Sequence, residues 1–349
     1  MNERMATPGS HPRPLALRVE NLRTVYRTGD REISVVRGVS FDVYAGEIVG
    51  LVGESGSGKS TVLKSVLDLI GERGETHADV LEIAGRDVRS LPREEYRRLR
   101  GIEMSLVSQD PINAFNPAWT IGSQLRRFLK RLAPDKSRKE LDAWALELLK
   151  GVGIDGRGKL SSYPFQFSQG QLQRIMIALA CASDRLKVLF ADEPTTSLDV
   201  TIEAQVLQLI RRLRDERGMA VVLVTHNLSV VAEICDRVMV MYAGRIVEEA
   251  PVRDLFRNPQ HPYTRQLLKA IPSFPRNGKR LETMPGRVPD LSVDVPGCAF
   301  APRCRDRISD LCEHTRPVMP PAAEPGAARA ACHLVTSSAP TGGAQRRPA

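Results

Sequence analysis

The stretch Gly53-Glu54-Ser55-Gly56-Ser57-Gly58-Lys59-Ser60-Thr61 decides the fold of this chain. It follows an apolar run at 48–52 that indicates a buried strand, and it leads into a helical pattern at 62–67. A strand, a loop of spacing G-x-x-x-x-G-K-S and a helix together form a phosphate-binding loop. Its glycines leave backbone N–H groups free to surround an anion, and the helix turns its positive end toward that anion. We therefore predict that the chain binds a nucleoside triphosphate. The alternative is a glycine-rich turn that only resembles the motif.

The side chains of this loop and of a second strand end supply the chemistry of triphosphate binding. Lys59 is predicted to place a point charge on the β- and γ-phosphates, and the Ser60 hydroxyl to bind Mg²⁺. Asp192 follows the apolar run 187–191, at the position of a Mg²⁺-holding carboxylate. Glu193 beside it can polarise an attacking water. Ordinary loop polarity is the alternative for this acidic pair, and the upstream phosphate loop favours the functional interpretation.

Two more polar residues stand at strand ends. Gln109 follows a strand expected within 101–109 and is predicted to be a second-sphere ligand of Mg²⁺ and water. His226 ends the apolar run 220–225 and is predicted to sense the γ-phosphate. Carboxyl ends of parallel strands meet at one sheet edge, so these side chains are expected near the phosphates.

A second anion site is predicted where a serine and a glycine precede an apolar helix at 172–182. Its residues are Ser168, Gln169, Gly170 and Gln171. Since one chain has one phosphate loop, two phosphate-grasping sites imply that two chains meet head to tail with ATP between them.

Composition bounds the remaining possibilities. The 349 residues, with 42% apolar content, suggest one large domain plus an appendage. The net charge of +9 is spread along the chain, which favours solvated faces over a nucleic-acid surface. No run approaches the roughly 18 apolar residues that span a bilayer. The polar stretch 1–14 lacks the apolar core of a signal peptide. We expect a cytoplasmic protein that reaches a membrane only through partners.

Short apolar strands separated by helical stretches predict an α/β fold with a mainly parallel sheet. Alternating segments between residues 15 and 52 predict an antiparallel β flank. The charge-dense helix at 93–100 is expected to be only a solvated face. An inserted helical subdomain is expected at about 112–180, with Leu141, Leu146, Leu148 and Leu149 as its apolar face. The predicted divisions are a disordered N-terminus at 1–14, an ATPase domain at 15–257, a C-terminal extension at 258–335 and a disordered tail at 336–349.

The six cysteines form two groups. Cys181 and Cys235 lie in apolar helical segments and are predicted to belong to the core. The other four, spaced C-x5-C-x7-C-x19-C, are Cys298, Cys304, Cys312 and Cys332. Four thiolates suit Zn²⁺ or an iron–sulfur cluster, although the spacing lacks a paired C-x-x-C. Four free thiols are the alternative, and disulfides are disfavoured in the cytosol.

The motifs described above, and their order along the chain, resemble those of the ATP-binding subunit of an ABC transporter. The resemblance implies a P-loop ABC cassette that binds ATP and Mg²⁺ and hydrolyses ATP to drive solute translocation. Its elements are Walker A at 53–61, the Q-loop at Gln109, the signature at 167–171, Walker B at 188–193, the switch histidine at His226 and the D-loop at Ser197, Leu198 and Asp199. Tyr26 stands where the family places a ring that stacks on adenine. A surface tyrosine in a turn is the alternative.

Narrower stretches resemble the oligopeptide/dipeptide/nickel importer branch. They lie at 53–59, 108–111, 115–117, 192–201, 241–244, 261–264 and 297–304. The resemblance implies two integral-membrane permeases, a second ABC ATPase, an extracytoplasmic solute-binding protein and no direct nucleic acid. It places the chain at the cytoplasmic face of the membrane, beside a paralogue rather than a second copy. Some relatives hold a [4Fe–4S] cluster on similar cysteines.

The residues do not decide the identity of the cargo or the effect of one residue of the signature. Peptide is the expected cargo, with nickel or another small solute as the alternative. A soluble ABC ATPase that acts on nucleic acid or the ribosome is the rival from a different class. The family usually has two glycines after the signature serine, whereas this chain has Gln169 before Gly170. We expect the signature still to close on ATP, with slower hydrolysis at that composite site.

Overall fold

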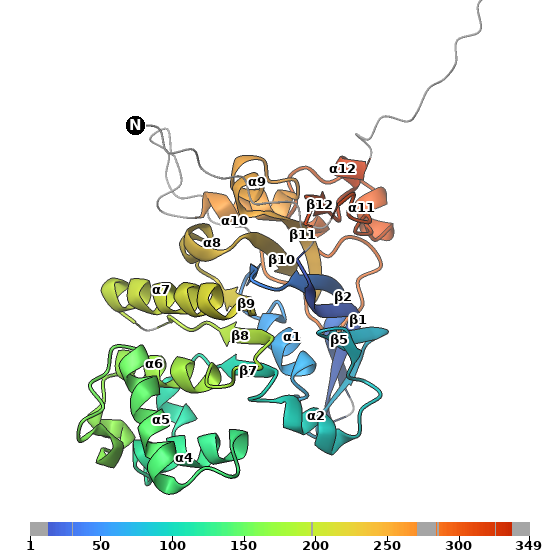
Figure 1. Cartoon of the computed structure of the whole chain (residues 1–349). Coiled ribbons are helices and arrows are strands. Elements are labelled where there is room, and N and C mark those ends of the chain that lie inside the picture. The colour runs from blue at the N-terminus through green and yellow to red at the C-terminus, as the bar shows by residue number, and fades with distance from the viewer. Residues whose placement is uncertain are drawn as a thin grey trace, which may run out of the picture.

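Figure 1 presents the computed structural model of the chain, which describes residues 13–29, 31–196, 198–270, 284, 286–324 and 326–336. The disorder predicted for 1–14 and 336–349 falls on residues outside these ranges, apart from Arg13, Pro14 and Thr336. Arg13 and Pro14 directly precede the first strand, and Thr336 ends the last helix.

An antiparallel flank opens the fold. Two long strands, β1 (Leu15–Thr28) and β2 (Arg31–Tyr44), pair along their length. The other edge of β1 pairs with β4 (Gly74–His77) and β5 (Val80–Ile83), and β5 pairs with β6 (Arg86–Asp87). Leu17, Val19 and Leu22 are buried on one face of β1. The predicted antiparallel flank is confirmed, and its strands run further than the apolar alternation because register shifts carry the pairing past irregular positions.

The central sheet has the strand order β12-β11-β10-β3-β9-β8-β7 within the described residues. Neighbouring strands from β10 to β7 pair in parallel, whereas β11 and β12 are antiparallel. Every residue of β3, β9 and β10 is buried, which explains their continuous apolar runs. The mainly parallel sheet is therefore confirmed. The strand bounds are β3 (Ile48–Val52), β7 (Met104–Val107), β8 (Val188–Asp192), β9 (Ala220–Thr225), β10 (Arg237–Tyr242), β11 (Arg245–Pro251) and β12 (Arg329–Ala330).

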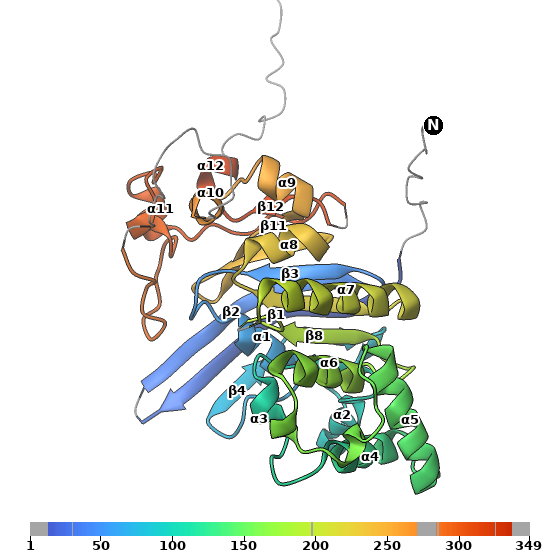
Figure 2. The same cartoon turned by 90° about the vertical axis from the view of Figure 1, so that its left-hand side faces the viewer.

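Both faces of this sheet are covered. Figures 1 and 2 show α7 (Val200–Arg217) and α8 (Leu228–Ile234) on one face, and α1 (Lys59–Val66) with the antiparallel flank on the other. Alternate strand residues serve the two layers: Ile48 packs in the helical core, and Val49 packs with the flank. The phosphate loop thus joins the buried strand β3 to the helix α1, which packs on one face of the sheet.

A helical group lies below the sheet in Figure 1, at the edge strand β7. The helix α5 begins with a capping box, in which Ser137 and Glu140 exchange hydrogen bonds. The inserted helical subdomain predicted here is thus present as a set of packed helices. Its elements are α3 (Pro111–Ala114), α4 (Ile121–Leu132), α5 (Arg138–Gly151), the 3-10 turns η1 (Lys159–Ser161) and η2 (Pro164–Gln166), and α6 (Gln169–Ala180).

Two details of the sequence analysis are wrong. Leu146 is 38% exposed, because the buried face of α5 follows the four-residue spacing of Leu141, Ala145 and Leu149. The charge-dense helix α2 (Arg93–Leu99) is not only a solvated face. Its Tyr96 is buried, and the Tyr96 hydroxyl donates a hydrogen bond to the Val66 carbonyl at the end of α1.

The last part of the chain, residues 258–336, is here called the C-terminal segment. It contains α10 (Pro262–Lys269), η3 (Ala301–Arg303), α11 (Leu311–His314), β12 and α12 (His333–Thr336), and α9 (Val252–Arg257) precedes it. Through β12 the segment adds a short strand to β11, and Figures 1 and 2 show the segment above that edge of the sheet. Tyr263 and Phe300 of the segment pack on Tyr242 of β10 in one apolar cluster. The boundary at 258 stays a prediction.

None of the helices in the described ranges has both the length and the apolar composition needed to cross a membrane.

Candidate nucleotide-binding site

Glycine permits the close packing of the phosphate loop. Gly53 has φ +155, and a Cβ there would lie 2.2 Å from the Met241 carbonyl oxygen on β10. Gly58 has φ +103, and its Cβ would lie 2.8 Å from the Val35 carbonyl oxygen on β2. Any side chain at these positions would collide with backbone, so the sequence pattern is required for this loop to form between β3 and α1.

Lys59 lies inside the loop. Its Nζ donates hydrogen bonds to the carbonyl oxygens of Gly53 at 2.8 Å and Glu54 at 2.9 Å. The side chain is buried, and burial lowers the pKa of Lys59, although the carboxylates of Glu193, Asp192 and Glu54 act in the opposite direction. The ammonium therefore sits among the loop and the carboxylates that sequence analysis assigned to the same site.

Ser60 and Asp192 form an oxygen pair beside Lys59. The Ser60 hydroxyl donates to Asp192 Oδ1 at 2.8 Å. Burial raises the pKa of Asp192. A hydroxyl and a carboxylate that meet at one point, at the mouth of a phosphate loop, are hard oxygen donors of the kind Mg²⁺ prefers. These residues fit the predicted Mg²⁺.

Glu193 gathers the remaining predicted side chains. Its Oε1 lies 3.1 Å from His226 Nδ1, and its Oε2 accepts hydrogen bonds from Thr196 Oγ1 at 2.9 Å and Gln109 Nε2 at 3.5 Å. The Glu193 side chain is 18% exposed, whereas that of His226 is 60% exposed. The strand ends of β7, β8 and β9 thus bring three predicted residues together, as their order in the sheet requires.

Thr196 is a contact of this site that sequence analysis missed. It lies within the stretch 192–201, but no role was assigned to it. Its hydroxyl is three residues from Glu193, and the Thr196 N–H also donates to the Glu193 carbonyl at 3.2 Å. A tight turn after β8 could have suggested this contact, because a hydroxyl three residues on can return to the first side chain.

The signature residues lie at the start of α6. Ser168 caps the helix: its Oγ accepts from the Gln171 N–H at 3.2 Å, and Gln171 Oε1 accepts from the Ser168 N–H at 3.0 Å. Gly170 is buried, and a Cβ there would lie 2.6 Å from Ile202 Cγ2 on α7. Gln169 is half-buried in the first turn of the helix. None of these hydrogen bonds reaches the phosphate loop of the same chain.

The D-loop residues precede α7. Asp199 is the N-cap of that helix and accepts from the Ile202 N–H at 3.0 Å. Leu198 packs against the helical core. Ser197 lies outside the described residues. Because Gly170 contacts Ile202, the signature helix and the helix after the D-loop meet directly.

Tyr26 lies on β1 and is half-buried. Its ring rests against Gly74 of β4, where an added Cβ would lie 3.1 Å from the ring. Within the described part of the chain, no hydrogen bond or ring contact joins Tyr26 to the phosphate loop. Stacking on adenine remains a prediction.

None of the six cysteines, all of which lie in the described ranges, forms a disulfide. Cys181 is buried, as predicted, and burial raises its pKa to about 12. Cys235 packs against the core. The Cys298 N–H donates to the Cys312 carbonyl at 2.8 Å, so the fold brings these two cysteines together. Within the described ranges, however, no group of three or more His, Cys, Asp or Glu residues is arranged to hold a metal ion. The four C-terminal cysteines, Cys298, Cys304, Cys312 and Cys332, do not form such a group in this structure, and the Zn²⁺ or cluster stays a prediction.

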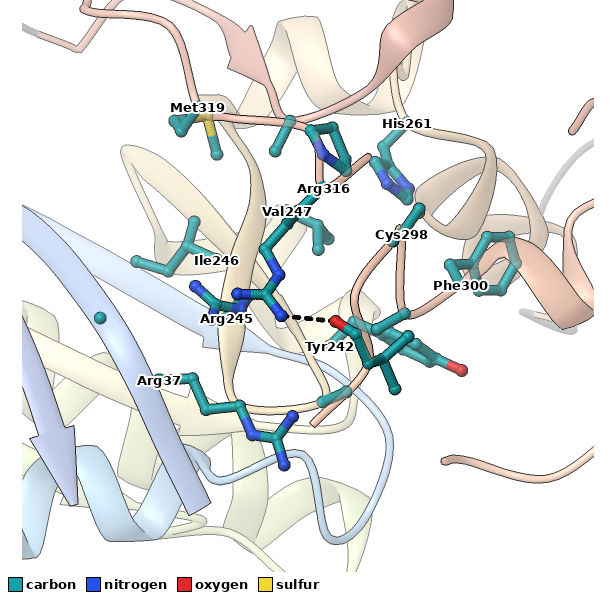
Figure 3. Close-up of a pocket in the computed structure, with 17 residues that line it drawn as sticks. Arg37, Tyr242, Arg245, Ile246, Val247, His261, Cys298, Phe300, Arg316 and Met319 are labelled. Carbon is teal, nitrogen blue, oxygen red and sulfur yellow. Dashed lines mark hydrogen bonds between the residues drawn. The ribbon is translucent and has the colours of Figure 1, made fainter. Parts of the chain in front are cut away.

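A separate cavity of 110 Å³ lies between β10, β11 and the C-terminal segment (Figure 3). Arg37, Arg245 and Arg316 line it together with Cys298 and Phe300. Burial and the charges of Arg316 and Arg37 lower the pKa of Arg245 to about 10. The phosphate loop does not line this cavity, which is therefore distinct from the nucleotide site.

Comparison with known proteins finds family matches in two parts of the chain. Residues 36–196 match the family described as ABC transporter, and residues 247–312 match the family described as oligopeptide/dipeptide transporter, C-terminal region. A Brucella abortus (strain 2308) protein is 47% identical over 301 residues, which span 82% of this chain and 88% of the relative. A Brucella suis biovar 1 (strain 1330) protein is 46% identical over 289 residues, or 82% and 86% of the two chains. Both are provisionally named peptide import ATP-binding proteins.

Solved structures agree with the fold. An ATP-binding cassette, solved as a dimer in a post-hydrolysis state with ADP and Pi, has a TM-score of 0.60 and 28% identity. It covers 68% of this chain and 99% of its own. A second structure of the same cassette, described as a dimeric bacterial ABC transporter cassette, has a TM-score of 0.60 and 29% identity, with the same coverage.

Proposed function

This chain belongs to the ABC transporter family, and from that premise we propose that it is the ATP-hydrolysing subunit of an importer of di- or oligopeptides. The match of residues 247–312 to the oligopeptide/dipeptide transporter family and the names of the relatives support the peptide cargo. Nickel or another small solute is the alternative within the same branch. The observation that carries the ATPase activity is the contact of Glu193 with His226, Thr196 and Gln109 beside the Lys59 loop.

Each residue of the site has a step in the proposed hydrolysis. The backbone of the phosphate loop and Lys59 hold the β- and γ-phosphates. Ser60 and Asp192 would hold Mg²⁺, which neutralises charge on the phosphate oxygens. Glu193 accepts a proton from the attacking water and is oriented by Thr196. Gln109 and His226, on either side of the carboxylate, position the water and contact the γ-phosphate.

The signature residues are proposed to act on a second cassette. Ser168 and the N–H groups of the first turn of α6 would bind the γ-phosphate held by the partner's phosphate loop. The dimeric state of one similar cassette, seen in two solved structures of it, supports this arrangement. We propose a paralogous ATPase as the partner. Gln169 adds a side chain where the family usually has glycine, which slows hydrolysis at the composite site.

Permease contact is proposed at the helical group next to Gln109. Ile112 is 56% exposed and Phe165 76% exposed, and Tyr163 stacks on Phe165 with ring centroids 5.6 Å apart. Trp119 is 40% exposed on the same group of helices. Exposed apolar side chains gathered on one part of a surface favour a protein partner. Two integral-membrane permeases would bind there, hold the chain at the cytoplasmic face of the membrane and receive cargo from an extracytoplasmic solute-binding protein.

A pair of variants tests the ATPase assignment. Glu193→Gln is expected to lower the turnover of MgATP by roughly 10²–10⁴-fold while MgATP binding survives, because the amide cannot accept the proton of the water. Lys59→Ala is expected to weaken MgATP binding by about 1.5–3 kcal/mol, because it removes a charge-assisted contact. Glu216→Gln, an exposed carboxylate on α7, serves as the matched control.

The measurements are equilibrium MgATP binding and steady-state phosphate release by the purified chain. Unchanged hydrolysis in the Glu193→Gln variant would remove Glu193 from the role of base. Unchanged binding in the Lys59→Ala variant would contradict the assignment of the phosphate loop.

A further inference from the structure

Glu54 brings a negative charge into the loop that must accept a polyanion. Its carboxylate is bound by Arg303 in a two-point contact, with Nη1 2.7 Å from Oε2 and Nη2 3.0 Å from Oε1. The Arg303 side chain is 5% exposed and that of Glu54 26% exposed. The two residues are 249 positions apart in sequence. A guanidinium of the C-terminal segment therefore pairs with the phosphate loop in a largely buried contact.

The backbone of Glu54 is held from two sides. Its N–H donates to the Tyr263 hydroxyl at 2.9 Å, and its carbonyl accepts the hydrogen bond from Lys59 at 2.9 Å. Tyr263 belongs to α10 of the C-terminal segment and is fully buried. Every polar group of Glu54 is thus engaged: Tyr263 and Arg303 of the C-terminal segment make three hydrogen bonds with it, and its carbonyl accepts from Lys59 and from the Ser57 N–H.

Contacts with Tyr242 orient the Arg303 guanidinium toward Glu54. Nη1 also donates to the Tyr242 hydroxyl at 3.3 Å, and the guanidinium carbon lies 5.8 Å from the centre of the Tyr242 ring. Tyr242 packs on Tyr263 and Phe300, with ring centroids 4.6 Å and 5.3 Å apart. Figure 3 shows Tyr242 and Phe300 among the residues that line the neighbouring cavity. The hydrogen bond with Glu54 raises the pKa of Arg303, so the cation persists at every working pH.

An unpaired carboxylate at position 54 would oppose triphosphate binding. The charge of Glu54 already acts on the Lys59 ammonium, so its field reaches the place where the phosphates are held. Without Arg303, that field would repel the phosphates, and the two-point contact that orients the loop would be lost.

We propose that Arg303 is a positioning residue for ATP: it neutralises Glu54 and, with Tyr263, holds the phosphate loop in its binding conformation, so that the C-terminal segment sets the affinity for ATP. The proposal rests on the proposed function of the loop as the ATP site. It gives the C-terminal segment a direct role in the nucleotide cycle, in addition to its place in the fold.

A double-mutant cycle tests it in the full chain, with MgATP as the probe. Arg303→Ala is expected to raise the dissociation constant for MgATP about 10-fold, because a charge-assisted contact is lost and Glu54 is left unpaired. Glu54→Gln alone is expected to raise it only about 3-fold, because the orienting contact is lost but no unpaired carboxylate repels the phosphates. The combined Glu54→Gln and Arg303→Ala variant should bind within about 3-fold of the wild type. Arg307→Ala is the control, because it breaks an exposed ion pair with Glu313 within the same segment.

The MgATP affinity of the double variant shows whether Arg303 acts through Glu54 or only through the stability of the fold. Recovery of affinity in the double variant supports the proposal, and a double variant as weak as Arg303→Ala overturns it. Thermal unfolding without nucleotide identifies any variant that fails to fold. In that case Arg303→Gln, which removes the charge but can still donate hydrogen bonds, takes its place. Wild-type MgATP affinity in Arg303→Gln, together with weakened MgATP binding in Lys59→Ala, overturns the proposal while the ATP site stands. Wild-type affinity in Lys59→Ala instead removes the proposed function itself.

Discussion

Glu193 has a backbone φ of 46°, in a region that non-glycine residues rarely adopt. Such a conformation costs on the order of 1–3 kcal/mol and persists only where neighbours determine it. The Glu193 N–H donates to the Val224 carbonyl at 2.9 Å, and its carboxylate is held by Thr196, His226 and Gln109. The turn after β8 therefore stores strain in order to present this carboxylate at the sheet edge.

Thr196 is the best-placed of these partners, so its hydroxyl should matter for turnover. Thr196→Val keeps the shape but removes the hydrogen bond to Glu193, and kcat for ATP is expected to fall about 10-fold. The KM for ATP should stay within about 2-fold, because Thr196 does not belong to the phosphate loop. Steady-state hydrolysis checks this. Thr196→Ser keeps the hydroxyl and should keep kcat near that of the wild type. Equal kcat values for the valine and serine variants would show that the hydrogen bond from Thr196 to Glu193 does not contribute to turnover.

Sequence reasoning predicted which residues lie together where their positions follow from local spacing. Lys59, Ser60 and Glu193 each follow a strand in a motif of fixed length, and the strand order then brings them together. Arg303 and Tyr263 could not be found in this way, although both lie in stretches that were recognised, because their contacts with Glu54 depend on how distant segments pack. The four-cysteine metal site was expected from residue type and from the family resemblance, and among the described residues no such group of ligands is assembled.

Among the elements, apolar runs predicted β3, β8 and β9 well because these strands are buried on both faces. In contrast, β12 consists only of Arg329 and Ala330 and carries no periodic signal, so its addition to β11 could not be predicted. The error at Leu146 has a similar origin. The helical period gives several candidate faces, and only the packing of α4 and α6 against α5 selects the buried one.

The helix α10 depends on a neutral histidine. His261 Nδ1 accepts a hydrogen bond from the Tyr263 N–H at 3.0 Å and caps the helix, while the His261 N–H donates to Glu248 at 2.9 Å. His261 is 1% exposed, and burial lowers its pKa to about 4, with a smaller contribution from Arg265. The His261 imidazole is therefore protonated near pH 6.5 in the unfolded chain, but only near pH 4 in the folded chain.

The consequence is an acid-sensitive α10. The neutral His261 contributes fully to the free energy of unfolding above pH 6.5. Up to about 3 kcal/mol of that free energy is lost as the pH falls from 6.5 to 4. His261→Asn keeps a side chain that caps helices and cannot be protonated in this range. Urea unfolding at pH 7 and pH 5 should show a loss smaller by about 2 kcal/mol in the variant than in the wild type. Identical losses in both proteins would contradict the buried neutral histidine.

At the scale of the whole molecule, a line of charges crosses from the cassette to the C-terminal segment. Arg237 of β10 is 5% exposed and pairs with Glu47 at 2.8 Å and with Glu249 of β11. Glu249 is 3% exposed and also accepts from Arg329 of β12 at 2.9 Å. Four charged residues thus join segments that are far apart in sequence, at the same edge where β12 pairs with β11. The segment that carries Arg303 is therefore anchored independently of the phosphate loop.

Glu249 is the shared member of this network, so its charge should decide whether the C-terminal segment unfolds with the cassette. Glu249→Gln leaves Arg237 and Arg329 without their common carboxylate, and breaking a buried pair in this way is expected to cost about 3–5 kcal/mol of unfolding free energy. Urea unfolding measures the loss, and Arg27→Ala, which breaks an exposed pair with Glu32, should cost at most about 1 kcal/mol. A second, earlier transition in the Glu249→Gln variant would mean that the segment detaches first. MgATP affinity should then fall together with that transition, because Arg303 leaves the phosphate loop with the segment. A detached segment with unchanged affinity would contradict the link between the two.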